Sequence, residues 1–394
     1  MDLLVRRIGR LHPMSGPLLN DAAVLIRGGS IAWLGRERDV PADLGDIPEL
    51  DAEGGTVTPG FVDAHTHLVW AGTRREEFAA RLAGEDYDGG GIRTTVAATR
   101  AATHDELLTA AMERARAAMS HGTTTMEIKT GYGLSRSQEL RLLAVIAELD
   151  RQLPLNVEAT FLGAHVVPES VDRRQYVQEV IDTLPDARTA GAQWCDVFCD
   201  EGVFSLEETR EILEAAATLG FGLRLHAEEI AHTGAAGLAA ELGCASADHL
   251  EHVSATDAKS MAAAGVVGVL LPTVTLSLRT FAFDQVAVLK EAGVELALAT
   301  DCNPGTSWCE SMPYVIQLAC LVYGLSVEEA LRAATLGGAH SLRRNDVGQL
   351  AVGARGDLAI LDVDHEADLV AHLGAAAVAR TVVGGAVWPS LDVS

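Results

Sequence analysis

Two histidines separated by one residue, His65 and His67 in the segment VDAHTHL, have the residue type and spacing to bind a metal ion. The apolar segment just before them, residues 56–62, predicts a short β-strand. Side chains at positions i and i+2 of a strand point to the same face, so both imidazoles can contact one ion. A single His-x-His pair is weak evidence, because such pairs also occur as ordinary surface or core residues. A metal site therefore requires further ligands from elsewhere in the chain.

The elements that must position these ligands are eight apolar runs alternating with Ala-rich segments. The runs are GFVDAHTHL, TTTMEIKTGYGL, LNVEATFLGAH, WCDVFCDEGVF, GLRLHAEE, CASADHLEH, VVGVLLPTV and ELALATDCNPG. Connecting segments such as SLEETREILEAAATLG have apolar residues at helical spacing, and Ser205 with Glu208 predicts a capping box. Eight β/α units in series predict an α/β protein with a closed (β/α)8, TIM-like barrel. We assign this barrel to residues 58–349.

The two ends of the chain have a different pattern. AAVLIRGGSIAWLG near the N-terminus, and GDLAILDVD and VARTVVGGAVW near the C-terminus, are short alternating runs with glycine between them. Such runs predict antiparallel strands joined by tight turns. We therefore expect residues 1–57 and 350–394 to form β-structure outside the barrel.

Polar side chains stand at the ends of several predicted barrel strands, which is where barrels of this type carry their chemistry. One histidine at a strand end is usually structural. Several at corresponding ends of different strands converge on one mouth and are hard to explain by packing. These residues are His65 and His67 after the first strand, His165 after the third, His226 and Glu229 at the fifth, His249 at the sixth and Asp301 at the eighth.

Four of these residues form a nitrogen and oxygen donor set that suits Zn²⁺ or iron, with an open position for water. They are His65, His67, His226 and Asp301. Water bound to such an ion loses a proton near neutral pH and becomes a nucleophile. The third and fourth apolar runs contain no lysine that a second metal would need as a carbamylated bridge. Lys129, after the second strand, is interpreted as an ion-pairing or loop residue, so we expect one ion per chain, Zn²⁺ or Fe³⁺.

Composition excludes some partners. The formal net charge of −25 argues against a nucleic-acid or anionic-membrane surface, although a local arginine still permits a small anionic substrate. The N-terminal segment MDLLVRRIGRLHP lacks the apolar run of a secretory signal, and no run is long enough to span a membrane. We therefore expect a cytoplasmic protein with reduced cysteines. Cys195 and Cys199 are interpreted as packed side chains, with a structural zinc as the alternative.

With these residues in place, the chain resembles the amidohydrolase superfamily. Its members share the barrel, the His-x-His after strand one, a histidine at strand five and an aspartate at strand eight. The resemblance covers essentially the whole chain and implies that the two termini build one small composite β-sandwich. Its more specific segments are VWAGTRREEF, GGGIRTTV, EIKTGYGL, TFLGAHVVP, LHAEE, SADHLEH and DCNPGTS. The chain departs in KTGYGL, where KSGYGL is commoner, and in Glu229, where some members carry Gln.

These segments imply a particular reaction, the hydrolysis of 4-imidazolone-5-propanoate to N-formimidoyl-L-glutamate in histidine degradation. The substrate is then a small anion, and a homodimer is expected because dimers are common in the superfamily. Two alternatives stay open. Another mononuclear amidohydrolase, such as a nucleobase deaminase or a different cyclic-amide hydrolase, would share the metal ligands. A non-catalytic scaffold would have lost ligands, and here all four are kept.

The resemblance also implies substrate contacts. Arg74 offers a fork suited to a carboxylate, although alone it would be interpreted as a solvated charge. Tyr132 and His165 are expected to hydrogen-bond the ring or the tail. The segment DCNPGTS is also a standard turn sequence, and a rigid turn can direct an amide and backbone N–H groups towards a carboxylate. The full expected set is Arg74, Tyr87, Tyr132, His165, Glu229, Asn303, Gly305 and Thr306.

Three residues are expected to share the proton transfers of ring opening. His249 is placed to contact the nucleophile or the developing oxyanion, and Glu229 can carry a proton to the departing nitrogen. Asp301 can accept the proton of water as well as bind the metal. The sequence does not divide the acid and base roles among them. His252, three residues after His249, is expected to point away from the mouth if the strand continues.

Overall fold

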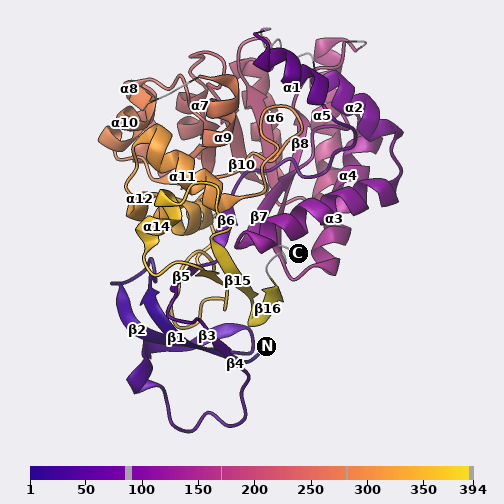
Figure 1. Cartoon of the computed structure of the whole chain (residues 1–394). Helices are drawn as coiled ribbons and strands as arrows, with labels where there is room; N and C mark the ends of the chain where they lie inside the picture. The colour runs from indigo at the N-terminus through magenta and orange to yellow at the C-terminus, as the bar shows by residue number, and fades with distance from the viewer. Residues whose placement is uncertain (85–90, 170, 281–282, 390–394) are drawn as a thin grey trace.

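The computed structural model describes residues 1–84, 91–169, 171–280 and 283–389. The chain forms two units, a parallel barrel surrounded by helices and a smaller sheet built from both ends of the chain (Figure 1).

Eight parallel strands follow one another around the barrel in chain order. They are β6 Phe61–Asp63, β7 Thr123–Lys129, β8 Asn156–Ala164, β9 Trp194–Cys199, β10 Gly222–Ala227, β11 Ser246–His249, β12 Val267–Leu270 and β13 Leu296–Leu298. The barrel closes beyond the ends of β6 and β13, where Thr66 and Cys302 form a parallel bridge. The backbone N–H of His67 donates to the carbonyl of Cys302 at 3.0 Å. The predicted (β/α)8 barrel is confirmed.

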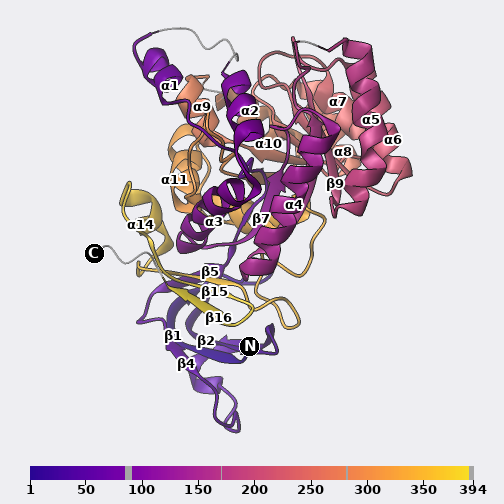
Figure 2. The same ribbon diagram turned by 90° about the vertical axis from the view of Figure 1, so that its right-hand side faces the viewer.

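Helices follow the strands and cover the outside of the barrel (Figures 1 and 2). Their bounds are α1 Arg75–Leu82, α2 Ile92–Ala101, α3 His104–Ser120, α4 Arg136–Gln152, α5 Arg173–Thr189, α6 Leu206–Thr218, α7 Ala235–Leu242, α8 Ala255–Ala264, α9 Pro272–Leu278, α10 Phe283–Ala292, α11 Met312–Tyr323, α12 Val327–Arg332, η2 Ala333–Gly337 and α13 Gly338–Ser341. The predicted capping box begins α6, with Ser205 accepting the N–H of Glu208. Within the described ranges, no helix is both long and apolar enough to span a membrane.

The ends of the chain form one mixed sheet below the barrel. Its strands are β1 Leu3–Leu11, β2 Leu19–Arg27, β3 Ser30–Arg36, β4 Glu49–Asp51, β5 Thr56–Pro59, β14 Leu358–Leu361, β15 Val378–Val383 and β16 Ala386–Pro389, with η1 Glu37–Asp39 and α14 Glu366–Ala371 in the connections. N-terminal β5 pairs with C-terminal β14, so the two ends share one hydrogen-bonded sheet. The predicted composite unit is confirmed.

A single strand predicted over residues 56–62 is in fact two strands that separate at Gly60. β5 belongs to the terminal sheet and β6 to the barrel. A Cβ atom at Gly60 would lie 2.2 Å from the Thr124 side chain, so the chain passes between the two units where only glycine fits. The apolar pattern does not reveal this change of sheet, because both strands are fully buried. The division predicted at residues 57/58 falls inside β5, so we propose that the first division lies at Gly60 and keep the second at residues 349/350 as a proposal.

The terminal sheet contacts the end of the barrel where the strands begin. Asn156, the first residue of β8, donates from Nδ2 to Asp357 Oδ2 at 3.1 Å. The N–H of Gly60 donates to the Asp357 carbonyl at 3.0 Å. The carboxyl ends of the strands therefore face the opposite side, where chemistry is found in such barrels.

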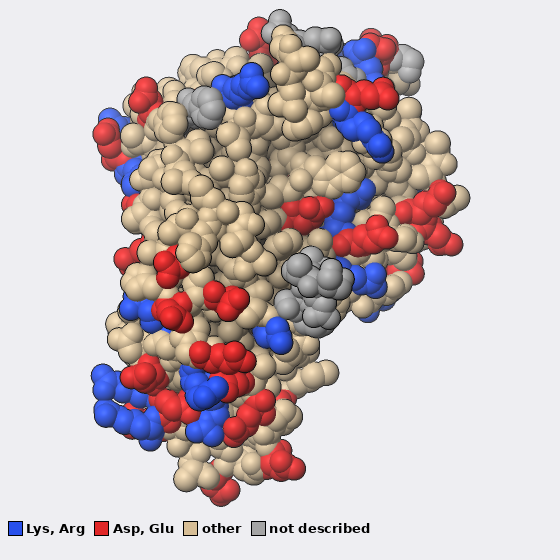
Figure 3. Space-filling model, in the orientation of Figure 1, with Lys and Arg blue, Asp and Glu red and all other residues tan. Residues whose placement is uncertain are grey.

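Charged side chains of both signs alternate over the terminal sheet in Figure 3, while the centre of the barrel face in that view is largely uncharged. Pairs on this sheet include Arg6 with Glu37 at 2.7 Å and Arg10 with Glu366 at 2.7 Å. Partly exposed pairs of this kind typically contribute about 1 kcal/mol or less to stability. We infer that they mainly keep this sheet soluble.

Candidate active site

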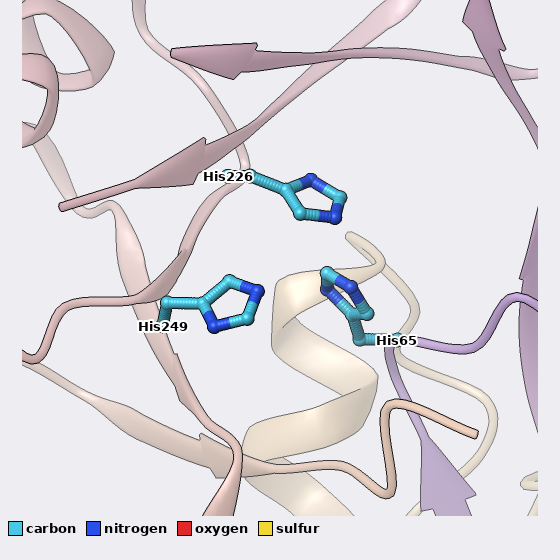
Figure 4. Close-up of side chains that lie close together, drawn as sticks. All are labelled: His65, His226 and His249. Carbon is cyan, nitrogen blue, oxygen red and sulfur yellow. The ribbon is translucent and has the colours of Figure 1, made fainter. Parts of the chain in front are cut away.

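Three imidazole rings point towards one another at the carboxyl end of the barrel (Figure 4). His226 lies in β10, His249 ends β11, and His65 follows β6. The ring centroids of His65 and His226 are 4.4 Å apart, and those of His226 and His249 are 5.4 Å apart. His67 and Asp301 complete this group of five, which derives from four different strands.

The donor atoms have the spacing that a single ion requires. Nε2 of His65 and Nε2 of His67 lie 3.6 Å and 3.4 Å from Oδ1 of Asp301. Nε2 of His226 lies 3.4 Å from Nε2 of His67. Ligand atoms about 2.1 Å from a tetrahedral ion are about 3.4 Å apart. Among the residues that the structure describes, His65 Nε2 and Asp301 Oδ1 are buried without a hydrogen-bond partner. The residues present therefore fit a bound metal ion.

The electrostatics of the site agree with this assignment. Burial lowers the pKa of His65 and of His67 well below the ordinary histidine value, so both rings are neutral at pH 7. Neutral imidazole is the form that binds metals. Burial also raises the pKa of Asp301 well above its usual range. A cation beside this carboxylate would offset the cost of its charge.

Two buried aspartates that the sequence did not single out orient the histidines. Nδ1 of His65 lies 2.7 Å from Oδ2 of Asp248, and Nδ1 of His226 lies 3.0 Å from Oδ2 of Asp196. A carboxylate on the far nitrogen fixes the tautomer and directs the other nitrogen at the metal. The sequence did contain a signal for these two residues. Both aspartates lie within predicted barrel strands, where a buried charge is costly unless another group pairs with it.

Lys129 and Arg224 neutralise these aspartates inside the barrel. Lys129 Nζ lies 2.7 Å from Asp196 and 2.9 Å from Glu127, and Arg224 Nη2 lies 3.3 Å from Asp248. All these side chains are completely buried. The interpretation of Lys129 as an ion-pairing residue is confirmed. Removing one member of a buried charge cluster typically costs about 3–5 kcal/mol, because it leaves the remaining charge buried without its partner.

The backbone is strained at two of the converging residues. His249 has φ of 79° and Asp301 has φ of 46°, in the left-handed region that non-glycine residues seldom adopt. Strain of this kind typically costs about 1–3 kcal/mol and collects at functional sites. Here it turns the chain at the ends of two strands so that both side chains face the mouth.

A cavity of about 1200 Å³, lined by residues that the structure describes, opens above the histidines. His165 and Tyr132 stand on one wall. The His165 ring stacks on that of His67 at 5.0 Å, and its Nδ1 lies 3.1 Å from the Gly131 carbonyl. Burial lowers the pKa of His165 to about 3. Both predicted substrate residues therefore lie beside the candidate metal ligands.

The loop that carries Tyr132 is held by two residues that the sequence analysis did not find. The buried Glu139 carboxylate accepts the N–H groups of Gly131, Gly133 and Leu134 at 2.6–2.9 Å. Arg100 donates to the carbonyls of Gly133 and Leu134 at 2.6 and 2.8 Å. This pair fixes the loop from both sides.

Arg74 lines the cavity, but it is also paired. Nε and Nη2 donate to the two oxygens of Glu77 at 3.0 and 2.5 Å. Gly305 packs against the guanidinium so closely that a Cβ atom there would lie 2.1 Å from Nη1. Glu77, which the sequence did not single out, thus sets the orientation of Arg74.

The DCNPGTS segment forms a closed turn. Oδ1 of Asn303 accepts the N–H groups of Gly305 and Thr306, each at 2.8 Å, and Nδ2 donates to the Asp301 carbonyl at 2.7 Å. The amide and both N–H groups are thus used within the turn. Asn303 and Thr306 line the cavity. Their contact with a substrate stays a prediction, and the turn itself holds Asp301.

The remaining predicted residues differ in their placement. Glu229 lines the cavity, with Oε2 3.7 Å from Nε2 of His249. Tyr87 lies outside the described residues. The expectation that His252 points away from the mouth is wrong, since it lines the same cavity. The strand ends at His249, and the chain turns there with positive φ at His249 and Leu250, so strand alternation no longer applies.

Comparison with known proteins identifies the family. Residues 56–387 match the model described as the Amidohydrolase family. This chain belongs to the amidohydrolase family.

Relatives within this family are similar along the whole chain. The imidazolonepropionase of Mycolicibacterium smegmatis is 46% identical, covering 100% of this chain and 99% of that protein. The imidazolonepropionase of Salinispora arenicola is 46% identical, covering 98% of each.

Solved structures also share this fold. The adenosine deaminase of Xanthomonas campestris with bound zinc has a TM-score of 0.74 at 20% identity, covering 98% of this chain and 92% of that one. The atrazine chlorohydrolase TrzN of Arthrobacter aurescens, complexed with zinc, has a TM-score of 0.73 at 19% identity, covering 99% and 96%. At these identities the likeness concerns the fold alone.

Proposed function

We propose that this protein is a metal-dependent hydrolase that converts 4-imidazolone-5-propanoate and water to N-formimidoyl-L-glutamate in histidine degradation. The observation that carries the proposal is the 46% identity to proteins named imidazolonepropionase over the full chain. The converging donor atoms of His65, His67, His226 and Asp301 support it, because they form a set that could hold the metal ion of such a hydrolase.

We further propose that one ion, Zn²⁺ or Fe³⁺, binds at these four residues. When bound, such an ion lowers the pKa of water and polarises a carbonyl. Zinc is favoured by its presence in the adenosine deaminase and the atrazine chlorohydrolase. Iron fits the same nitrogen and oxygen donors, and metal analysis of the purified protein distinguishes the two.

The proton transfers of ring opening can be assigned to residues of this chain. Water adds to the ring carbonyl carbon, the bond from that carbon to the ring nitrogen breaks, and the nitrogen takes up a proton. We propose that one of two neighbouring groups, His249 or Asp301, receives the proton of water, and that Glu229 delivers a proton to the departing nitrogen. Burial and nearby carboxylates raise the pKa of Glu229 well above its usual range, which favours the protonated donor form.

We propose that the propionate tail binds beside Arg74. Arg74 supplies a guanidinium in the cavity, and Tyr132, His165, Asn303 and Thr306 line the same space. A nucleobase deaminase would hold an uncharged ring and has no need of a cation here. This feature favours the propionate-bearing substrate over a neutral base.

The direct experiment follows the ultraviolet absorbance of imidazolone propanoate made in situ by urocanase. Purified, metal-loaded protein should accelerate its decay, and a chelator should remove the acceleration. Loss of the absorbance at the uncatalysed rate, with turnover of cytosine or guanine instead, would replace this function by the nucleobase deaminase alternative.

We also propose that the protein acts in the cytoplasm as a homodimer on a small anionic substrate, without nucleic acid or membrane. The high negative charge supports the last two points. Light scattering on the purified protein gives the oligomeric state, and a monomer mass would exclude the dimer.

A further inference from the structure

The two ring nitrogens of His249 face different carboxylates. Nε2 lies on the cavity side, 3.7 Å from Oε2 of Glu229. Nδ1 lies on the other side, 3.9 Å from Oε2 of Glu251. In the described part of the chain, neither His249 Nδ1 nor Glu251 Oε2 has a hydrogen-bond partner, and both atoms are buried. An unpaired buried polar atom typically costs about 1–3 kcal/mol, so two complementary ones facing each other call for an explanation.

Glu251 is anchored by its other oxygen. The Thr275 hydroxyl donates to Oε1 of Glu251 at 3.0 Å, and the Tyr323 hydroxyl lies 2.6 Å from Thr275 Oγ1. Glu251 is 5% exposed and Thr275 is fully buried. Burial raises the pKa of Glu251 to about 7, and the hydrogen bond from Thr275 offsets part of this rise. Oε2 is left to face His249.

The backbone holds the ring and the carboxylate in place. The N–H of Leu250 donates to the Ala227 carbonyl, and that of His252 donates to the Glu228 carbonyl, each at 3.0 Å. The gap of 3.9 Å between Nδ1 and Oε2 exceeds a hydrogen bond by about 1 Å. A small rotation of either side chain closes it, and catalytic hydrogen bonds are often long before substrate binds.

We propose that Glu251 is a positioning residue that accepts a hydrogen bond from Nδ1 of His249 and thereby directs the Nε2 lone pair at the reacting water. This inference rests on the proposed function, and it assigns the proton transfers of that reaction to His249 and Glu229. Nε2 takes a proton from water as the oxygen bonds to the ring carbonyl carbon. Glu229 gives its proton to the departing nitrogen and regains one from His249 across the 3.7 Å between them. The protons balance, and Asp301 is left as a metal ligand.

Three variants test the role of Glu251. Glu251→Leu removes the acceptor, and Glu251→Gln keeps a carbonyl oxygen that can still accept the Nδ1 proton. Loss of such an orienting partner typically lowers activity about 10–100-fold. We expect the larger loss for the Leu variant and partial recovery for the Gln variant, in kcat with KM nearly unchanged. Glu158→Gln is the matched control. Glu158 is about as buried as Glu251 and is paired with Arg344 at 2.7 Å, but it lies near the start of β8, at the end of the barrel away from the mouth. This variant should keep the wild-type kcat.

A second measurement does not depend on turnover. Nitrogen-15 NMR of zinc-loaded, histidine-labelled protein distinguishes the two neutral tautomers, and His249→Asn identifies the signals of His249. The wild type should carry the proton on Nδ1, and Glu251→Leu should move it to Nε2. An unchanged tautomer in the Leu and Gln variants, or an unchanged kcat in both, would overturn the inference. If wild-type protein shows the Nδ1 tautomer but no hydrolysis of imidazolone propanoate, the proposed function fails and the positioning role of Glu251 stands.

Discussion

Nδ1 of His65 lies 2.7 Å from Oδ2 of Asp248, and both side chains are completely excluded from solvent. The contact joins strands at positions 183 residues apart in the chain, and it leaves Nε2 of His65 directed at Asp301. A ligand histidine held in this way presents one nitrogen in one orientation. The metal site therefore depends on a residue that need not touch the metal.

Asp248→Asn tests this dependence. The amide can donate to Nδ1 and so favour the wrong tautomer of His65, and metal affinity should fall about 10–100-fold. Competition with a chromogenic chelator measures the affinity. Asp357→Asn is the control, because it changes a buried carboxylate just before β14, at the opposite end of the barrel, and this variant should keep wild-type affinity. Equal affinity in Asp248→Asn and wild type would show that Asp248 serves only the charge balance with Arg224.

His249→Ala tests whether His249 is a metal ligand or a catalytic group. Donor atoms of His65, His226 and His249 lie within 4.8 Å of one another, so distance alone leaves His249 eligible as a ligand. We expect metal content near one ion per chain and a fall in kcat of about 10²–10⁴-fold, the usual contribution of a general acid or base. His226→Ala should instead lose the metal. Parallel loss of metal in both variants would make His249 a ligand.

Arg74→Met should weaken substrate binding. A hydrogen bond to a charged group contributes about 1.5–3 kcal/mol, so KM should rise about 10–150-fold with a smaller change in kcat. Glu77→Gln is the informative partner, because it removes the carboxylate that now holds Arg74. That variant should keep or lower KM. An unchanged KM in Arg74→Met would place the propionate tail elsewhere.

Acid should weaken the contact between α5 and α6. Arg173 donates to Glu208 at 2.6 and 2.8 Å and holds the pKa of Glu208 at about 2, below the ordinary value of 4.5. A lowered pKa gives stability that is present above pH 4.5 and is lost as the pH falls towards 2. Glu208→Gln keeps the capping geometry, so it should reduce stability at pH 7 by about 0.5–1 kcal/mol, with Arg173 partly exposed.

Urea unfolding at several pH values measures this effect. The difference between Glu208→Gln and wild type should shrink between pH 4.5 and 2, and it should be absent in an Arg173→Met background. A difference that is constant across this range would assign it to lost packing instead.

The sequence predicts the barrel because the barrel follows from simple periodicity, whereas the predicted substrate residues in the cavity wall, such as Arg74 and Tyr132, came from the resemblance to the amidohydrolase superfamily. Strand ends in a barrel meet at one mouth, so His65, His226 and Asp301 could be assigned to one site without knowing any contact. The capping box at Ser205 depends on only four consecutive residues, so it could also be predicted from the sequence.

Features that depend on long-range contacts could not be predicted from the sequence. The break at Gly60 arises from the close approach of Thr124, which no local pattern encodes. Strand alternation alone would place Asp248 and His249 on opposite faces, and the left-handed backbone at His249 is what allows both to serve the site. The pairing of Arg74 with Glu77 and the facing of His249 and Glu251 are set by side-chain orientation after the chain has folded.

The proposed function depends most on a single cation held at the carboxyl end of the barrel by residues of the first, fifth and eighth strands and the segments that follow them. Anomalous diffraction at the zinc edge, from crystals of the zinc-loaded protein, measures this directly. We expect one strong peak about 2.0–2.2 Å from Nε2 of His65, His67 and His226 and from an oxygen of Asp301. A peak confined to the second cluster of candidate ligands, Glu228, His232 and Asp257, or no peak within the barrel mouth, would contradict it.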